Sequence, residues 1–210
     1  MFKQCKEDIQ AVKERDPAAR SSLSIILNYP GVQALWQHRI EHWLWSHGRK
    51  GISRFLSQMT RFFTGIEIHP AATLGSKVVI DHGMGVVIGE TSVVGDYCTI
   101  YQGVTLGGTG KDKGKRHPTI GDHVLIGAGA KVLGPFTVGD YSKIAANAVV
   151  LSEVPPNCTA VGVPAKIVKR DGIKITDDLD QINIPNPVAT ELNCLQEQIN
   201  AIIANLNLNK

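Results

Sequence analysis

Three absences narrow the classes of protein to which this chain of 210 residues can belong. No apolar run approaches the roughly 18 residues that a membrane-spanning helix needs, and the first ten residues, MFKQCKEDIQ, are charged from the start. We therefore expect a cytoplasmic protein with neither a membrane span nor a secretory signal. The formal net charge is only +3, because 22 basic residues are balanced by 19 acidic ones, so nucleic acid is not the expected partner.

Paired cysteines are also missing. The sequence has four cysteines that stand singly, without CxxC spacing: Cys5, Cys98, Cys158 and Cys194. This pattern favours free thiols over a zinc knuckle or a disulfide framework.

Residues 1–64 carry helical patterns and form the first predicted domain. The segments DIQAVKER, SSLSIILN and GVQALWQHRIEHWLWSHG read as helices, with a break at Asp16 before Pro17 and a stop at Gly48. One stripe at helical spacing predicts a packed face in the third segment: Val32, Leu35, Trp36, Ile40, Trp43 and Leu44. The same segment contains HRIEH at 38–42, which fits a zinc-peptidase pattern, but no distal carboxylate motif accompanies it and we predict helix packing.

Residues 65–169 form the second predicted domain and carry a six-residue repeat. Its aliphatic positions are Ile68, Leu74, Ile80, Ile88, Val94, Ile100, Leu106, Ile120, Ile126, Val132, Val138, Ile144 and Val150. Glycine follows seven of them: Gly75, Gly89, Gly95, Gly107, Gly121, Gly127 and Gly139. Three short strands per coil predict a triangular parallel β-helix with the aliphatic residues on its axis, and glycine is expected to provide the backbone conformations of the corners.

The repeat is interrupted twice, and each interruption contains a histidine. Eight residues instead of six separate Ile80 from Ile88, and fourteen instead of twelve separate Leu106 from Ile120. A regular scaffold fixes the position of groups in such irregular segments, so His82 and His117 are candidate site residues. A neutral imidazole can accept a proton, and a carboxylate orients it; Glu67 is the candidate for that role.

The tail, 170–210, has a polar linker followed by a short apolar seam. Leu192, Leu195, Ile199, Ile202 and Leu206 alternate by three and four residues. Two placements are open: a short helical bundle within an oligomer, or a helix that lies on its own chain.

Specific segments resemble the serine O-acetyltransferase family. They are GIEIHPAATLG, IDHGMGVVIGE, YQGVTLGGTGKDKGKRHPTIGDHVLIGAGAKVLGP and VPPNCTAVGVPAKIV, with DIQAVKERDPAA and HRIEHWLW in the helical part, and they cover about residues 4–170. The resemblance implies an α+β fold in which a helical domain precedes a left-handed β-helix. It also implies transfer of an acetyl group from acetyl-CoA to the hydroxyl of L-serine, without a covalent acyl-enzyme, a bound metal or a permanent cofactor.

The resemblance assigns roles to several residues. His82 matches the general base, and Glu67 falls where the family often has Asp as the partner of that histidine. Charged groups would hold both ends of the serine zwitterion. These groups are Asp16 and Asp81 for the ammonium, and Arg116 and His117 for the carboxylate.

Further positions match the acetyl-CoA site. They are Gly108, Gly127, Ala128, Ala146 and Lys143. The small side chains at 127, 128 and 146 would let the pantetheine arm approach the backbone. The segment GGTGKDKGKR lacks the order of a P-loop. It matches an extended loop that closes over a site shared between subunits, with Lys111, Lys113 and Lys115 either near the CoA phosphates or in water.

The resemblance also implies partners. The family forms trimers or dimers of trimers, and its complex with O-acetylserine sulfhydrylase uses a C-terminal Ile. This chain ends in Lys210, so we expect that complex not to form.

Three alternative functions remain open at this stage. A γ-type carbonic anhydrase would use a zinc site built from His82, His117 and His123. The others are acetyl transfer to a sugar or antibiotic hydroxyl, and a non-catalytic oligomeric scaffold.

Overall fold

The computed structural model describes residues 2–110, 113–169 and 187–208. Four helices precede the β-helix and one follows it: α1 (Phe2–Arg15), α2 (Ser22–Asn28), α3 (Pro30–Ser46), α4 (Lys50–Thr64) and α5 (Pro187–Leu208). The helical pattern predicted for the tail is thus confirmed, while its linker lies outside the described residues. None of the described helices combines the length and apolar character that a membrane crossing requires.

The sequence contains the signals that start and end these helices. The side chain of Ser21 accepts a hydrogen bond from the amide of Ser24 at the beginning of α2, as an N-cap residue does. Pro30 occupies the first turn of α3, where its missing N–H costs nothing. Gly65 adopts a φ of 72° and ends α4 directly before the first strand.

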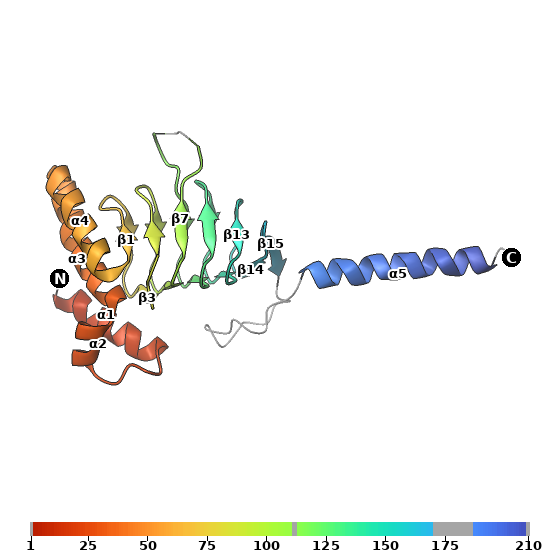
Figure 1. Cartoon of the computed structure of the whole chain (residues 1–210), viewed down its shortest axis with the longest axis horizontal. Helices are drawn as coiled ribbons and strands as arrows, with labels where there is room; N and C mark the ends of the chain where they lie inside the picture. The colour runs from red at the N-terminus through yellow and green to blue at the C-terminus, as the bar shows by residue number, and fades with distance from the viewer. Residues whose placement is uncertain (1, 111–112, 170–186, 209–210) are drawn as a thin grey trace.

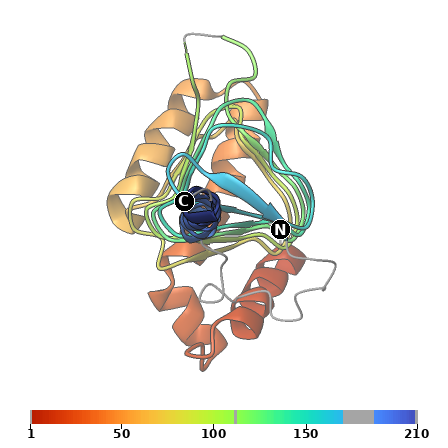
Figure 2. The same ribbon diagram turned by 90° about the vertical axis from the view of Figure 1, so that its right-hand side faces the viewer.

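Three sheets form the triangular β-helix seen end-on in Figure 2. Sheet A contains β1 (Glu67–Ile68), β4 (Val87–Ile88), β7 (Thr105–Gly107), β10 (Lys131–Leu133) and β13 (Val149–Val150). Sheet B contains β2 (Thr73–Leu74), β5 (Val93–Val94), β8 (Thr119–Ile120) and β11 (Thr137–Val138). Sheet C contains β3 (Val79–Asp81), β6 (Thr99–Tyr101), β9 (Leu125–Ile126), β12 (Lys143–Ile144), β14 (Cys158–Val161) and the antiparallel β15 (Lys166–Lys169).

The predicted parallel β-helix is confirmed, and the aliphatic repeat positions form its core. Twelve of the thirteen are buried, and Leu74, which borders a cavity between the helices and β2, is half-buried. Equivalent positions stack in register, as Ile80 does on Ile100. The second interruption differs from our prediction: Leu106 and Ile120 are consecutive core positions on β7 and β8, so the interval is one repeat with a long insertion at its corner.

Our expectation for the glycines was wrong. None of the seven glycines that follow core positions has a positive φ. They are required by the close approach of the next coil: a Cβ on Gly75 would lie 2.6 Å from the carbonyl carbon of Gly95, and one on Gly95 would lie 2.7 Å from that of Gly121. At the turn from sheet B to sheet C the left-handed conformation is adopted by other residues, namely Lys77, Tyr97, His123 and Tyr141.

The packed face of α3 also differs from the prediction. Val32 and Leu35 are buried, but Ile40 and Trp43 are 39% and 57% exposed. The buried side chain of His38 replaces them, and its Nε2 lies 3.2 Å from the carbonyl of Ala72. The helix therefore packs on the first coil through a polar contact as well as through apolar ones.

Candidate active site

The turns between sheets stack into three columns, which we name corners CA, AB and BC after the sheets that they join. His82 follows β3 at corner CA. His117 precedes β8 at corner AB, after the long insertion. Both interruptions of the repeat therefore lie at the two ends of sheet A.

His82 is exposed at its corner. Its backbone has a φ of 58°, and its side chain is 73% exposed. Nε2 lies 4.0 Å from Oδ2 of Asp81. Glu67 instead pairs with Arg61 of α4, with 3.0 Å between Oε2 and Nη1. Among the described interactions of the chain none joins Glu67 to His82, so the orienting role of Glu67 stays a prediction.

Asp16 is bound by a tyrosine that the sequence did not mark as a site residue. The hydroxyl of Tyr29 donates to Oδ2 of Asp16 at 2.5 Å, and the amide of Ala18 donates to Oδ1 at 2.7 Å. The hydrogen bond to Asp16, with burial and the negative charges of Asp16 and Asp81, raises the pKa of Tyr29 to about 12. Two carboxylates from distant parts of the sequence therefore act on one phenol beside corner CA.

A single arginine fixes Asp16 against the β-helix. Nη1 of Arg15 donates to the carbonyl of Cys98 at 3.0 Å and to Oγ1 of Thr99 at 3.1 Å. This anchors the end of α1 on sheet C, so the following Asp16 is held by a rigid coil and not only by its own loop.

At corner AB, Arg116 and His117 are held by the preceding coil. Nη2 of Arg116 donates to Oε2 of Glu90, and this bond holds the pKa of Glu90 below its usual range. Oγ1 of Thr91 accepts from the backbone amides of Arg116 and His117 at 3.0 and 3.1 Å. Thr91 thus fixes the backbone of both residues.

The hydrogen bonds of His117 define its tautomer. Its Nδ1 lies 3.2 Å from the amide nitrogen of Thr91, which can only donate, and 2.9 Å from the hydroxyl of the same residue. Burial, and then the charge of Arg116, lowers the pKa of His117 and so favours the neutral ring. Nδ1 therefore accepts, and Nε2 carries the proton and can donate it to an anion.

The ring of His117 has room only because residue 89 is glycine. A Cβ on Gly89 would lie 2.0 Å from Cδ2 and 2.1 Å from Nε2 of His117. Gly89 and Thr91 are thus positioning residues for His117. In the sequence, Gly89 stands out only as part of the repeat.

The predicted acetyl-CoA positions fall at both corners. Gly127, Ala128 and Ala146 stack at corner CA, the column of His82, and a Cβ on Gly127 would lie 2.6 Å from the amide nitrogen of Ala146. Gly108 begins the insertion and lies beside Arg116. Close packing therefore gives each glycine a structural role in addition to the predicted one.

The predicted lysines differ in their surroundings. Lys143 on β12 is only 8% exposed. The Nζ of Lys115 donates to the carbonyl of Thr91 at 2.7 Å, and burial lowers the pKa of Lys115. Lys113 is exposed, and Lys111 lies outside the described residues.

The three histidines of the carbonic anhydrase alternative lie at three different corners. His123 occupies corner BC, where its ring stacks between Tyr97 and Tyr141 with centroids 4.6 Å away on each side. The described residues contain no group of three or more side chains that could hold a metal ion. Two protomers that meet through one corner of each would bring together only two of these three corners, so the geometry does not favour a shared three-histidine site.

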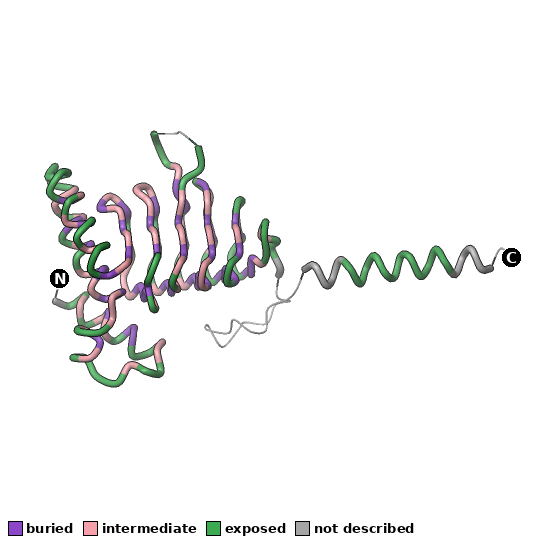
Figure 3. The backbone as a smooth tube through the Cα atoms, in the orientation of Figure 1, coloured by how far each residue is buried: buried purple, intermediate pink, exposed green. Residues whose placement is uncertain are grey.

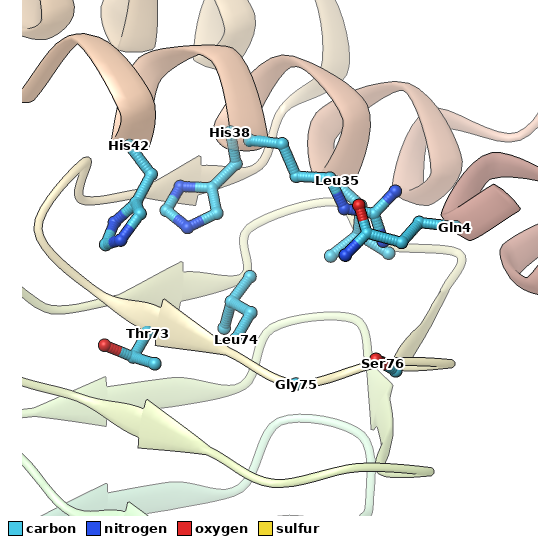
Figure 4. Close-up of a pocket in the computed structure, with 9 residues that line it drawn as sticks. Gln4, Leu35, His38, His42, Thr73, Leu74, Gly75 and Ser76 are labelled. Carbon is cyan, nitrogen blue, oxygen red and sulfur yellow. The ribbon is translucent and has the colours of Figure 1, made fainter. Parts of the chain in front are cut away.

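A cavity between the helices and sheet B is separate from these corners. It has a volume of about 250 Å³, and Figure 4 shows His38 and His42 of α3 facing Thr73 and Leu74 of β2. The Nδ1 of His42 lies 2.8 Å from the carbonyl of Pro70. The HRIEH segment therefore packs α3 on the β-helix, as we predicted, and none of the predicted site residues lines the cavity.

Comparisons with known proteins agree with this arrangement. Residues 1–37 match the family described as "Serine acetyltransferase, N-terminal", and residues 117–152 match "Bacterial transferase hexapeptide (six repeats)". The serine acetyltransferase of Bacillus subtilis is 54% identical over 98% of this chain and 94% of its own length, and that of Staphylococcus xylosus is 55% identical over 94% and 92%.

Solved structures give the same result. The crystal structure of Neisseria gonorrhoeae serine acetyltransferase has a TM-score of 0.81 and 46% identity over 87% of this chain and 70% of that chain. The same enzyme in complex with serine has a TM-score of 0.77 and 47% identity over 80% and 68%. A serine acetyltransferase in complex with CoA has a TM-score of 0.76 and 46% identity over 80% and 69%. The chain therefore belongs to the serine acetyltransferase family.

Proposed function

We propose that this enzyme transfers the acetyl group of acetyl-CoA to the hydroxyl of L-serine, with His82 as the general base. The observation that carries the proposal is sequence identity above half with named serine acetyltransferases over nearly the whole chain. It is supported by solved relatives in complex with serine and with CoA. The exposed imidazole of His82, beside a carboxylate at an interruption of the repeat, provides the base that this reaction needs.

The reaction is a direct displacement. His82 takes the hydroxyl proton of serine while the oxygen attacks the thioester carbonyl; the carbon–sulfur bond breaks, and the CoA sulfur leaves with the proton that His82 returns. Such positioned general-base catalysis contributes roughly 10²- to 10⁴-fold, and holding both substrates in line contributes much of the rest. Asp16 and Asp81 hold the ammonium of serine, while Arg116 and the Nε2–H of His117 hold its carboxylate.

We propose that two protomers share each site. His82 lies at corner CA and His117 at corner AB, at opposite ends of sheet A. No described interaction of the chain links these two corners. A second copy of the chain, placed with its corner AB against corner CA, would complete the set of charges around serine.

An exposed apolar surface supports association between copies. We name it the α4 face; its members are Ile52, Phe55, Met59, Phe62 and Phe63, which recur at helical spacing and are 57%, 65%, 36%, 78% and 76% exposed. Met84, two residues after His82, is 68% exposed. Apolar surfaces of this kind mark protein interfaces, and this one lies beside the proposed shared site.

Acetyl-CoA is proposed as a cosubstrate that runs along corner CA. Gly127, Ala128 and Ala146 leave this column without bulky side chains. The thioester would then lie next to His82, which stands at one end of the column. Lys113 and Lys115 are exposed cations at corner AB, which the proposed assembly places against corner CA of a second copy, and they are candidates for the CoA phosphates.

A thiol-release assay tests the reaction. With acetyl-CoA and L-serine we expect saturable release of CoA, and no release with a galactoside or chloramphenicol as acceptor. His82→Ala should lower kcat by at least about 10²-fold, whereas His47→Ala, at an exposed histidine away from both corners, should leave it unchanged. Equal rates for the wild type and His82→Ala would refute the proposal.

A mixing experiment tests the shared site. His82→Ala and Arg116→Ala chains are each expected to be nearly inactive, but a mixed assembly contains interfaces with an intact His82 from one chain and an intact Arg116 from the other. In random equimolar trimers roughly a quarter of the sites should recover activity, because each of the two chains at a site is of the required kind half of the time. No recovery after verified subunit exchange would show that each site is built by one chain.

The oligomeric state and the partner protein also belong to the proposal. Trimers or dimers of trimers are expected and are distinguished by the mass of the purified assembly. Lys210, on which the prediction about O-acetylserine sulfhydrylase depends, lies outside the described residues. Retention of the sulfhydrylase by immobilised enzyme at micromolar concentrations would overturn that prediction.

A further inference from the structure

The C-terminal helix α5 has an apolar face that no described part of its own chain covers. Side chains of one stripe are half exposed or more: Leu192, Leu195, Ile199, Ile202 and Ile203, at 60%, 54%, 50%, 59% and 50%. Figures 1 and 3 show α5 standing away from the β-helix, with its described residues exposed throughout. The alternative that this helix lies on its own chain therefore has no support in the described residues.

An isolated helix of this kind would be marginal in water. Between Pro187 and Leu208 the only charged residues are Glu191 and Glu197, so ion pairs along the helix do not support it. The described side-chain bonds of α5 join uncharged groups, such as the amides of Gln196 and Asn200 at 3.1 Å. A 22-residue helix that buries no face gains little beyond its own propensity, so a partner is needed.

We infer that α5 packs against the α5 helices of other copies of this chain in a parallel bundle, with Leu192, Leu195, Ile199 and Ile202 as its core. These residues alternate by three and four and occupy positions a, d, a and d of a heptad repeat. This inference rests on the association of copies through their β-helices that the proposed function requires, because that association brings their C-terminal ends to one side.

The flanking positions explain why the partner is another copy. In this register Gln196 and Ile203 occupy e, and Glu191, Gln198 and Asn205 occupy g. Parallel identical helices bring e and g positions together, and here they meet without repulsion of like charges. A partner of different sequence would find only one charged residue, Glu191, to recognise on these flanks.

The residues at the core positions favour more than two helices. Ile occupies both an a position, Ile199, and a d position, Ile202, and this combination favours trimers or tetramers over dimers. Ile203 widens the apolar face on one side. A third helix covers a face of this width, in agreement with the threefold assembly expected for the β-helices.

Cysteine cross-linking tests the bundle in the full-length protein. The background carries Cys5→Ser and Cys194→Ser. Each test variant then has one new cysteine in helix α5. Leu195→Cys and Ile202→Cys place it in the predicted core, and Glu197→Cys places it on the opposite face. Under mild oxidation both core variants should form disulfide-linked pairs of chains, whereas Glu197→Cys should form few. Because the helices of one assembly share a high effective concentration, the yield should survive about tenfold dilution.

A second pair of variants tests the helix itself. Ile199→Lys combined with Ile202→Lys should lower the helical signal in circular dichroism, whereas Asn200→Lys, on the other side of the helix, should preserve it. Mass and thiol-release activity are measured on the same samples. Two outcomes would overturn the parallel bundle alone, provided that the assembly keeps its mass and activity. One is equal cross-linking of the cysteines at positions 195, 197 and 202. The other is disulfide formation only when the Leu195→Cys and Ile202→Cys chains are mixed. A monomeric wild type overturns both the bundle and the shared site.

Discussion

The ring of His117 occupies space that any side chain at position 89 would need. A methyl group there would lie about 2 Å from the imidazole, so Gly89→Ala must push the ring away from its bond with Thr91. We expect the KM for serine to rise, with a loss in kcat/KM of about 10- to 100-fold, which corresponds to one hydrogen bond to a charged group. Steady-state kinetics at varied serine measures this effect.

The insertion that precedes His117 contains the control for this prediction. Gly114 has ordinary φ and open space around the position of a Cβ, so Gly114→Ala should leave the kinetics unchanged. If both variants resemble the wild type, His117 does not bind serine in the way that we propose.

Tyr29 supports Asp16 and provides the second prediction at this scale. Tyr29→Phe removes the donor at 2.5 Å from Oδ2 of Asp16 but keeps the ring. The carboxylate then loses part of its fixed geometry, and we expect kcat/KM for serine to fall several-fold to about 100-fold. Tyr141→Phe, which removes an exposed hydroxyl at corner BC, is the matched control. Equal kinetics for all three proteins would remove Tyr29 from the site.

The sequence identified the charged residues of the proposed site but not the residues that hold them. His82, His117 and Arg116 follow from the interrupted repeat and the family resemblance. Tyr29 was missed because it stands between two helices with no local motif, and its partner Asp16 is distant along the chain. Thr91 was missed because an isolated threonine carries no pattern; only the stacking of two coils brings its hydroxyl under Arg116 and His117.

At the scale of elements, corner BC couples each coil to the next through a carboxylate ladder. Oδ1 of Asp96, Asp122 and Asp140 accepts from the amide of Ser76, Asp96 and Asp122, respectively, at 2.6, 2.7 and 2.8 Å. Asp122→Ala should lower the thermal midpoint by a few degrees, since the lost bond contributes about 0.5–1.5 kcal/mol and each kcal/mol shifts the midpoint by about 2–4 °C.

Two variants test whether this effect belongs to the ladder. Asp122→Asn keeps an acceptor oxygen and should be closer to the wild type than Asp122→Ala. Glu153→Ala removes an exposed carboxylate outside the ladder and should shift the midpoint little. An equal loss of stability in Asp122→Asn and Asp122→Ala would assign the effect to charge rather than to the hydrogen bond.

The α4 face gives a prediction about association. Phe62→Ser combined with Phe63→Ser removes two apolar side chains that are more than three-quarters exposed in the single chain. Burial of one such side chain is worth about 1.5–3 kcal/mol, so the concentration at which the assembly dissociates should rise at least about tenfold. Sedimentation velocity over a dilution series measures this change. Gln58→Ser, exposed on the same helix but outside the α4 face, should behave as the wild type does.

At the scale of the whole molecule, periodicity alone predicted the β-helix because every coil buries the same kind of side chain at the same place. Residues 1–64 were harder to predict because helices that cap a β-helix bury polar groups where the cap requires them. His38 and Glu41 are buried while Trp43 is exposed, a pattern that helical spacing of apolar residues cannot reveal. The second interruption was misread for a related reason, since the sequence does not mark whether an insertion replaces a coil or extends one corner.

Two histidines beneath the helical cap, the buried His38 and the half-buried His69, are expected to make the fold sensitive to acid. Burial lowers the pKa of His38 to about 3 and that of His69 to about 4, from an ordinary value of 6.5. Above pH 6.5 each ring is neutral in both the folded and the unfolded state, so neither affects stability. Between pH 6.5 and the folded-state values the unfolded chain binds protons that the folded chain does not, and stability falls as the pH falls.

This loss has a measurable slope. For His38 it approaches about 1.4 kcal/mol per pH unit well below pH 6.5, and the less buried His69 adds a smaller share. Thermal midpoints from about pH 7.5 to about pH 5, at one protein concentration, should fall more steeply for the wild type than for His38→Gln, which has no group to protonate. His47→Gln, at an exposed position, should keep the wild-type slope. A general loss of stability in His38→Gln does not affect the test, because the slope of the thermal midpoint against pH is compared and not the midpoint itself. Parallel curves for all three proteins would show that His38 does not cause the acid sensitivity.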